Sequence, residues 1–188
     1  MRKLKLQMQV TADGYVAGPE GQLDWMAGTW DNDLLTLVNE LTDSSDTILM
    51  GRKMTDGFVN YWEHIVNNQP DSPEYDFAKK MVNLEKIVFS KTEKTIAGKN
   101  VVVENGDFTA AINKLKKQPG KDIVVYGGAG FVSSLIGANL IDELYFFVNP
   151  VAIGDGLSIF KNRQSLQLVS STPYKNGIVV NKYVPVKA

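Results

Sequence analysis

The sequence has no cysteine and only one histidine, and these absences remove whole classes of chemistry. Without cysteine the chain can form no disulfide, no thiolate metal site and no thiol nucleophile. With His64 alone, a histidine-based catalytic triad and a multi-histidine metal site are excluded as well. We therefore expect no bound metal ion, and the lack of cysteine fits a cytoplasmic protein.

The sequence also lacks an excess of charge of either sign and an unbroken hydrophobic run. Its 20 lysines and arginines and 21 aspartates and glutamates are interspersed and give a formal net charge of −1. We therefore expect small-molecule partners rather than duplex nucleic acid or an anionic membrane. Residues 123–141 carry no charge, but Gly127-Gly128 and Ser133-Ser134 interrupt them, so a buried strand and helix explain this segment better than a membrane span.

Two glycine-containing segments are the most informative features that are present. Met50-Gly51-Arg52-Lys53-Met54-Thr55 and Tyr126-Gly127-Gly128-Ala129-Gly130-Phe131 each follow a short run of branched apolar residues and precede helical spacing. Both are predicted to turn from a buried strand into a helix at the same sheet edge. Free backbone N–H groups and the helix dipole favour an anion there, and glycine permits its close approach. Because Arg52 and Lys53 add positive charge, we interpret the two turns as one dinucleotide site.

Strands and helices alternate along the chain, which predicts one α/β domain over residues 1–188. The length and an apolar content of 44% are sufficient for a full core. The preference of Asn176-Gly177 for positive φ predicts a C-terminal antiparallel hairpin. The other elements expected are strands at 4–11, 47–50, 86–90, 100–104, 123–126 and 143–148, and helices at 74–82, 131–138, after Gly51, after Asp107, and from about residue 31 with Leu34, Leu35, Val38 and Leu41 on one face.

The order of several short segments carries a family resemblance across nearly the whole chain. These segments are 11–17 (Thr-Ala-Asp-Gly-Tyr-Val-Ala), 49–55, 88–91 (Val-Phe-Ser-Lys), 126–130 and 141–144 (Ile-Asp-Glu-Leu), the last leading to Pro150 and Gly154. Together they resemble the dihydrofolate reductase superfamily, particularly the branch related to the C-terminal reductase domain of the bifunctional riboflavin-biosynthesis (RibD) proteins. The resemblance implies a three-layer α-β-α fold with a mostly parallel central sheet, and an NADPH-dependent reductase.

Carried over by position, the resemblance also implies where NADPH binds. Ser90 and Lys91 would contact the adenosine 2′-phosphate and favour NADPH over NADH, because a phosphate needs charge-assisted donors. A loop at 18–26 would cover the site and exclude water, with Trp25 completing it. The pyrophosphate would contact Gly51, Arg52, Lys53, Met54, Gly127, Gly128, Ala129, Gly130, Phe131 and Val132, and the nicotinamide pocket would be lined by Ala12, Val16 and Ala17.

The candidate catalytic groups are carboxylates near the start of the first helix. Hydride transfer to a C=N bond needs a proton for nitrogen and a group that holds the heterocycle, which a partly buried carboxylate supplies. Asp33 and Asp24, the latter beside Trp25, are the candidates, although the loop leaves the register open between Asp31 and Asp33. A helix-capping or surface role is the alternative for each acid.

Departures from the riboflavin-pathway pattern leave the substrate open between a pterin and a modified pyrimidine. Tyr126 stands where that branch has a glutamate, and residues 57–62 replace an Asp-Asn-Pro segment that handles a phosphoribosyl arm. The aromatic side chains of Phe58, Tyr61 and Trp62 could stack on a flat heterocycle or pack within the protein.

A second hypothesis is a dimeric protein that binds NADPH or a related nucleotide without catalysing its turnover. In both hypotheses a homodimer is expected. The apolar run Tyr145-Phe146-Phe147 and the uncovered strands near the C-terminal hairpin offer a surface of the kind that dimers bury, and the sequence leaves open which face pairs.

Overall fold

The computed structural model describes residues 1–26, 28 and 30–186 and shows an eight-stranded sheet in the order β4-β3-β2-β5-β1-β6-β8-β7. Neighbouring strands from β4 to β6 run parallel, and β8 pairs antiparallel with both β6 and β7. The strands are β1 (Leu4–Thr11), β2 (Ser45–Gly51), β3 (Glu85–Phe89), β4 (Val101–Glu104), β5 (Asp122–Val125), β6 (Glu143–Asn149), β7 (Leu166–Pro173) and β8 (Val179–Pro185). The helices are α1 (Asn32–Asp43), α2 (Arg52–Asn68), α3 (Tyr75–Asn83), α4 (Phe108–Lys117) and α5 (Ala129–Gly137).

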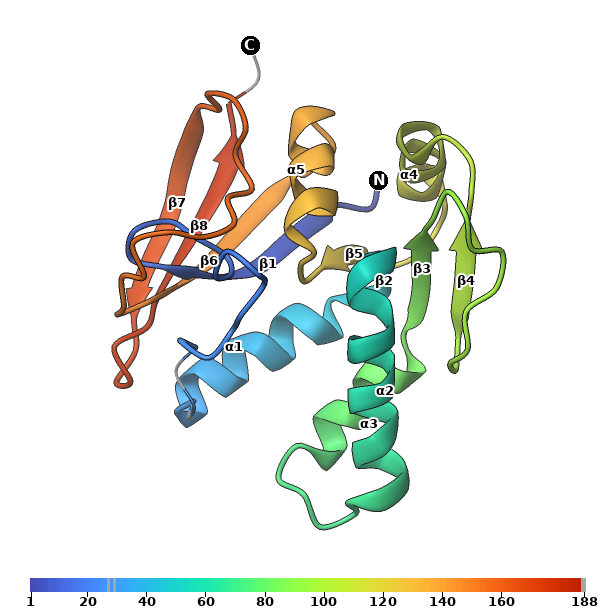
Figure 1. Ribbon diagram of the computed structural model, residues 1–188, viewed down its shortest axis with the longest axis horizontal. Coiled ribbons are helices and arrows are strands. Elements are labelled where there is room, and N and C mark those ends of the chain that lie inside the picture. The colour runs from blue at the N-terminus through green and yellow to red at the C-terminus, as the bar shows by residue number, and fades with distance from the viewer. Residues whose placement is uncertain (27, 29, 187–188) are drawn as a thin grey trace.

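Helices cover both faces of the sheet, which confirms the three-layer α-β-α architecture (Figure 1). Leu6 and Met8 of β1 face α4 and α5 in one core cluster with Ile112 and Val132. On the opposite face the core has two parts. One part lies under α1 and includes Leu34, Val38, Tyr145 and Phe147. The other part lies under α2 and α3 and includes Ile48, Met50, Met81 and Val124.

Of the helices in the described part of the chain, none has the length and apolarity needed to cross a membrane.

Two helices begin where polar caps predict them. The side chain of Asp107 accepts a hydrogen bond from the amide of Ala110 at the start of α4. Asp31 caps α1 in the same way, accepting from the amide of Leu34 at 2.8 Å. The expected apolar face of α1 is wrong at one position, because Leu35 is 42% exposed. It lies about 100° around the helix from Leu34, whereas Val38 and Leu41 fall on the buried side.

The expected aromatic dimer surface is also wrong. Tyr145, Phe146 and Phe147 are all buried within the single chain. They lie on β6, which is paired on both sides by β1 and β8, so neither edge of this strand is open. Phe147 stacks on Trp30 on one face, and Phe146 contacts Phe160 on the other.

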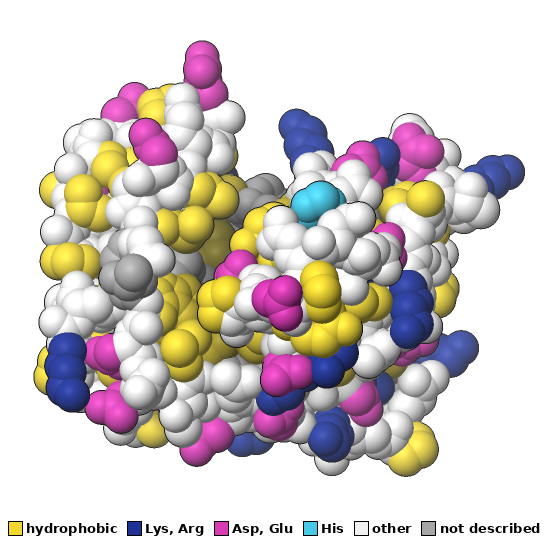
Figure 2. Space-filling model, turned by 90° about the horizontal axis from the view of Figure 1, so that it is seen from below, with side chains coloured by type: hydrophobic (Ala, Val, Ile, Leu, Met, Phe, Trp, Pro, Cys, Tyr) yellow, Lys and Arg dark blue, Asp and Glu magenta, His cyan; other side chains and the backbone are white. Residues whose placement is uncertain are grey.

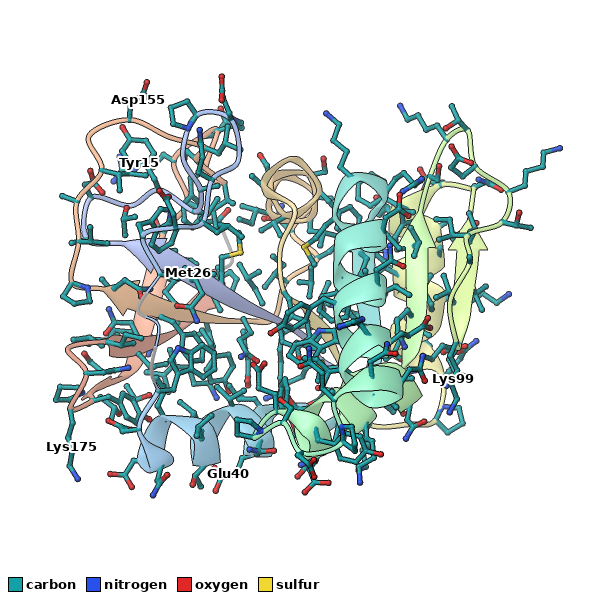
Figure 3. All side chains as sticks on the ribbon, turned by 60° about the horizontal axis from the view of Figure 1, so that its bottom comes forward. Tyr15, Met26, Glu40, Lys99, Asp155 and Lys175 are labelled. Carbon is teal, nitrogen blue, oxygen red and sulfur yellow. The ribbon has the colours of Figure 1, made fainter. Side chains whose placement is uncertain are left out.

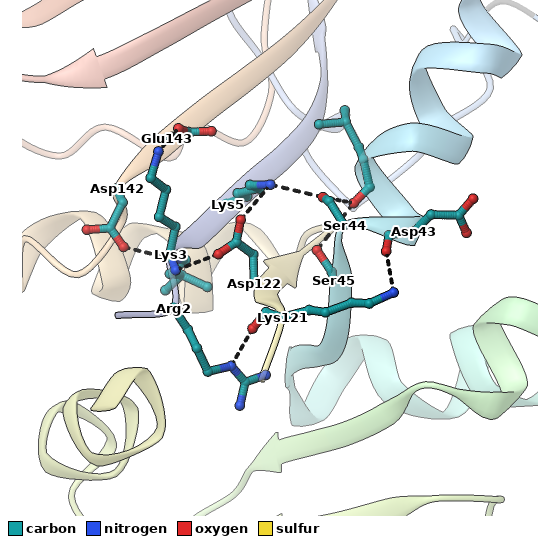
Figure 4. A network of polar contacts seen from close by, with 12 residues as sticks. Arg2, Lys3, Lys5, Asp43, Ser44, Ser45, Lys121, Asp122, Asp142 and Glu143 are labelled. Carbon is teal, nitrogen blue, oxygen red and sulfur yellow. Dashed lines mark hydrogen bonds and ion pairs between the residues drawn. The ribbon is translucent and has the colours of Figure 1, made fainter. Parts of the chain in front are cut away.

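Polar contacts join the amino ends of β1, β5 and β6, at the edge of the sheet opposite the glycine turns (Figure 4). Lys3 Nζ lies 2.6 Å from Glu143, and Lys5 Nζ lies 2.7 Å from Asp122. Lys182 of β8 approaches the second carboxylate oxygen of Glu143 at 3.1 Å. Because these contacts connect strands far apart in the sequence, they fix the ends of the central strands relative to one another.

The pKa of Glu143 predicts how this network depends on pH. Burial alone would raise that pKa, but hydrogen bonds from Lys3, Tyr145 and Lys182 outweigh burial and lower it to about 2, from an ordinary value of 4.5. The ionised form therefore contributes stability that is fully present above pH 4.5 and is lost as the pH falls toward 2.

We expect Glu143→Gln to remove this part of the acid dependence. The difference in free energy of unfolding between wild type and variant, from urea titrations, should shrink steadily from pH 5 to pH 2. Asp76→Asn, which disrupts the exposed pair with Lys79, is the control and should show a much smaller trend. A difference that stays constant across this range would show that Glu143 does not couple folding to protonation.

Candidate functional site

The two glycine turns lie side by side at the carboxyl ends of adjacent parallel strands. Leu49 of β2 pairs with Val125 of β5, so the residues that follow these strands emerge at the same edge. A Cβ atom added to Gly51 would lie 2.8 Å from Cβ of Phe131, and one added to Gly127 would lie 3.2 Å from the sulfur of Met54. Each turn therefore packs against the helix that begins at the other, as expected for two halves of one site.

Both helices that begin at this edge have amino termini suited to an anion. In the described residues, neither α2 nor α5 has a side-chain cap or an acidic residue in its first turn. Gly128, the residue before α5, has φ of +81°, a conformation that favours glycine. Amide groups of these first turns can thus point at a ligand, with the positive ends of two helix dipoles behind them.

Cationic side chains flank the first turn. The guanidinium of Arg52 is half-buried and lies 2.9 Å from the carboxylate of Asp56, one helical turn further along. Lys53 is exposed. An exposed pair of this kind contributes little to stability, so Arg52 can exchange its partner for a phosphate at small cost.

The turn after β3 lies beside the first glycine turn, because Phe89 pairs with Gly51. Ser90 is buried, and its hydroxyl oxygen accepts hydrogen bonds from the amides of Thr92 and Glu93 at 3.3 and 3.0 Å. Its own proton can still be donated. Lys91 is exposed next to it. The structure thus brings Ser90 and Lys91 to the edge where the two glycine turns meet.

One of the expected phosphate-turn residues is enclosed in the protein. Val132 is fully buried in the core under α5, and its amide donates to the carbonyl of Gly128 at 2.9 Å. Neither its side chain nor its amide is therefore available to a ligand. Ala129, Gly130 and Phe131 precede it in the first turn of α5, where amides are not yet used within the helix.

The segment expected to line the nicotinamide pocket is held by a second loop. Val16 and Ala17 are buried, whereas Ala12 is exposed, and Ala17 forms a bridge with Leu157. The amides of Ala12 and Val16 donate to the carbonyls of Val151 and Leu157 at 2.8 and 2.9 Å. Small side chains on a fixed backbone leave space against which a flat ring can pack.

Asp13 fastens these two loops together. Its carboxylate accepts from the amides of Ile153 and Gly154 at 3.1 and 2.8 Å, and from the hydroxyl of Thr11 at 2.5 Å. The Thr11 hydroxyl and the Gly154 amide lower the pKa of Asp13, so it is ionised at neutral pH. Sequence analysis placed Asp13 only within the family-like segment 11–17. Its partners Ile153 and Gly154 lie about 140 residues away, and no local pattern reveals them.

A hollow lies on the face covered by α1, α2 and α3. Figure 2 shows it lined by apolar side chains beside α2, which carries the single histidine, His64. In Figure 3 the loops bearing Tyr15 and Met26 lie on one side of this region and α2 on the other. The sheet between the two halves of the core on this face is formed by β1 and β5. Gln7 and Gln9 of β1 point to this face, because Leu6 and Met8 point to the other.

The expected acids are exposed or used as a helix cap. Asp31 caps α1 and also accepts a hydrogen bond from the amide of Lys175 at 2.9 Å, so its carboxylate has a structural role. Asp33 is exposed in the first turn of α1, and Asp24 is exposed in the loop. Trp25 is half-buried, and its indole N–H donates to the carbonyl of Gln22 at 3.2 Å.

The aromatic side chains after the first turn pack within the protein. Trp62 contacts Phe58, Tyr61 and Phe77 edge to face, with centroids 4.8 to 6.1 Å apart. Phe58 in turn stacks on Tyr126 at 5.9 Å. Internal packing accounts for Phe58 and Trp62, whereas Tyr61 is 51% exposed and its hydroxyl donates to Glu74 at 2.8 Å.

Tyr126 immediately precedes the double glycine and contacts both Phe58 and Thr42. Its hydroxyl lies 3.3 Å from that of Thr42 on α1. Burial raises the pKa of Tyr126 to about 12, so the phenol is neutral at physiological pH.

Among the side chains of the residues described, no group of three or more His, Asp or Glu could hold a metal ion.

The close approach of the turns predicts a position-specific effect of added methyl groups. We expect Gly51→Ala to lower the melting temperature by several degrees, since its Cβ would clash with Phe131. The matched control is Gly57→Ala in the same helix, where nothing lies within 4 Å of the added atom, and it should be neutral or stabilising. Equal effects of the two substitutions in thermal unfolding would contradict the packing described.

Comparison with known proteins agrees with this architecture. The chain is 34% identical to protein YyaP of Bacillus subtilis (strain 168) over 181 residues, which cover 95% of this chain and 92% of that protein. The fold is similar to that of the deaminase/5-amino-6-(5-phosphoribosylamino)uracil reductase of Thermotoga maritima, with a TM-score of 0.67 and 16% identity over 98% of this chain and 57% of the other. It is also similar to dihydrofolate reductase of Enterococcus faecalis complexed with NADP(H), with a TM-score of 0.64 and 18% identity over 98% of this chain and 97% of the other. Residues 2–180 match the model of the RibD C-terminal domain, and the chain belongs to that family.

Proposed function

We propose that this protein is a cytoplasmic NADPH-dependent reductase that transfers hydride to a pterin- or pyrimidine-like small molecule. The observation that carries the proposal is the contact between the two glycine turns, which brings two uncapped helix amino termini to one place beside Arg52 and Lys53. Membership of the RibD C-terminal family supports a reductase role. The similarity to a uracil reductase and to a dihydrofolate reductase complexed with NADP(H) supports the cofactor and the class of substrate.

Different residues at this edge of the sheet would bind different parts of NADPH. Amides of the first turns of α2 and α5, with Arg52 and Lys53, would hold the pyrophosphate. Ser90 and Lys91 would select the 2′-phosphate. Val16 and Ala17, fixed by the loop around Leu157, would support the nicotinamide, and bound NADPH would supply the hydride.

The reductase hypothesis needs a source of the proton that the substrate nitrogen receives, whereas a protein that only binds NADPH needs none. Asp33 and Asp24 are both exposed, so neither lies in the enclosed environment typical of a carboxyl group that acts as a general acid. This observation favours the second candidate, a protein that binds NADPH without turnover. In the reductase, the proton would instead come from solvent or from an acid brought inward by the loop at 18–26.

A titration with NADPH and NADH, followed by quenching of Trp25, Trp30 and Trp62 fluorescence, tests the cofactor. We expect clear preference for NADPH and a loss of about tenfold or more in affinity in Arg52→Ala, the cost of one charge-assisted contact. Arg163→Ala, at an exposed arginine outside this edge, is the control and should bind as wild type. If neither dinucleotide binds, the two-turn site is wrong.

Oxidation of NADPH with dihydropterin and aminouracil acceptors, followed in the same preparation, separates the two candidates. Turnover that falls in Asp33→Asn or Asp24→Asn while NADPH binding is retained identifies a reductase using that acid. Binding with no turnover of any acceptor favours the non-catalytic candidate.

We also propose a homodimer, through β7 rather than through the buried aromatic run of β6. β7 is an edge strand with one side unpaired, and Leu168 and Val169 are 53% and 52% exposed. An unpaired edge strand with exposed apolar side chains can pair with a strand of a second copy of the chain.

Sedimentation equilibrium tests this dimer. We expect Leu168→Lys to shift the protein toward monomer, because a charge on the edge opposes strand pairing. Val102→Lys places the same charge at an exposed position on the opposite edge strand, β4, and is the control. A wild-type protein that is monomeric at all accessible concentrations contradicts the proposal.

A further inference from the structure

A carboxylate lies at the same edge of the sheet as the proposed phosphate contacts. The strand order β4-β3-β2 places the ends of β3 and β4 beside the first glycine turn, on the side away from β5 (Figure 1). Phe89, the last residue of β3, pairs with Glu104, the last residue of β4, and the amide of Ser90 donates to the carbonyl of Glu104 at 3.1 Å. Since neighbouring strands are about 4.8 Å apart, the backbone of Glu104 lies one strand spacing from the turn that begins at Ser90.

The side chain of Glu104 lines an open groove between the sheet and α4. The groove has a volume of about 260 Å³. Phe89 and Glu104 line its end nearest the glycine turns, Ala111 and Lys114 line it from α4, and Glu85 lies at the opposite end. Glu104 is half-buried, so a ligand that extends from the glycine turns along this edge can reach its carboxylate.

The start of α4, at the same edge, is already capped by an acid. Asp107 accepts a hydrogen bond from the amide of Ala110 at 2.7 Å. This cap uses an amide and the dipole that remain available to an anion at α2 and α5. The cations nearest a phosphate at this place are Lys91, which is exposed, and Lys114, which lines the groove. Glu104 adds a negative charge beside them.

A carboxylate in this position has opposite effects on the two dinucleotides. It repels a 2′-phosphate, which carries about two negative charges at neutral pH. It can accept a hydrogen bond from the 2′-hydroxyl of NADH, as acidic residues do in other dinucleotide sites. The amide of Gly106 donates to one oxygen of Glu104 at 2.7 Å and holds the carboxylate at this edge. A carboxylate has about four acceptor positions, so this bond leaves it able to accept others.

We propose that Glu104 is a specificity-determining residue that weakens the binding of NADPH relative to NADH. This inference rests on the proposed function, because it requires a dinucleotide at the two glycine turns. Ser90 and Lys91 favour the 2′-phosphate and Glu104 opposes it. The preference for NADPH is therefore smaller than Ser90 and Lys91 alone would produce.

The test compares the dissociation constants of NADPH and NADH for wild type and Glu104→Gln, measured by calorimetry on the full-length protein. Glutamine removes the charge but keeps a carbonyl oxygen that can accept from Gly106. We expect the variant to bind NADPH about three- to tenfold more tightly, because one repulsive charge is gone, and to bind NADH equally well or more weakly.

Glu85→Gln is the matched control. It removes the same charge from the opposite end of the same groove. Glu85 lies four residues before Phe89, or about 13 Å along β3, and salt at about 0.1 M screens exposed charges over about 10 Å. This variant should leave the ratio of the two dissociation constants unchanged.

Salt dependence separates electrostatic repulsion from a change in the shape of the turn. The gain in NADPH affinity in Glu104→Gln should shrink as sodium chloride is raised from about 0.05 to about 0.5 M. The inference is overturned if the ratio of dissociation constants in Glu104→Gln equals that of wild type or of Glu85→Gln, if NADPH binding weakens, or if the gain is independent of salt. If wild type binds neither dinucleotide, the proposed function is wrong and the inference with it. If both bind and the ratio does not respond, only the inference is wrong.

Discussion

The candidate site depends on how closely two strand-to-helix turns approach each other. Gly51 lies so close to Phe131 that a Cβ atom would clash, and a Cβ atom on Gly127 would lie 3.2 Å from the sulfur of Met54, which would have to shift slightly. Because β2 and β5 are neighbours and parallel, both helices begin at the same edge, and their dipoles add at one place. The polar contacts of Lys3 and Lys5 at the opposite edge hold the central strands in the positions that this approach requires.

Two parts of the site differ in their electrostatics. The edge formed by α2 and α5 combines free amides with the charges of Arg52 and Lys53, and it suits a dianionic phosphate. The face of β1 between the two halves of the core carries the amides of Gln7 and Gln9, and the phenol of Tyr126, which follows β5, lies level with Gln7.

Local signals predicted most of the fold, and contacts between distant residues account for what they missed. The bounds of β1, the cap at Asp107 and the hairpin at Gly177 follow from neighbouring residues, as do the two glycine turns. Leu35 and the aromatic run of β6 were misplaced because their burial depends on which helix or strand covers them. The role of Asp13 in joining two loops could not be read from the sequence, since Ile153 and Gly154 lie about 140 residues away.

The strand order also decides when the protein can fold as it is synthesised. β1 is made first, yet its two neighbours in the sheet begin only at Asp122 and Glu143. Until β5 has left the ribosome, Leu4, Leu6, Met8 and Val10 have no neighbouring strand to pair with. Such long-range pairing makes folding slow and leaves an apolar segment open to other chains.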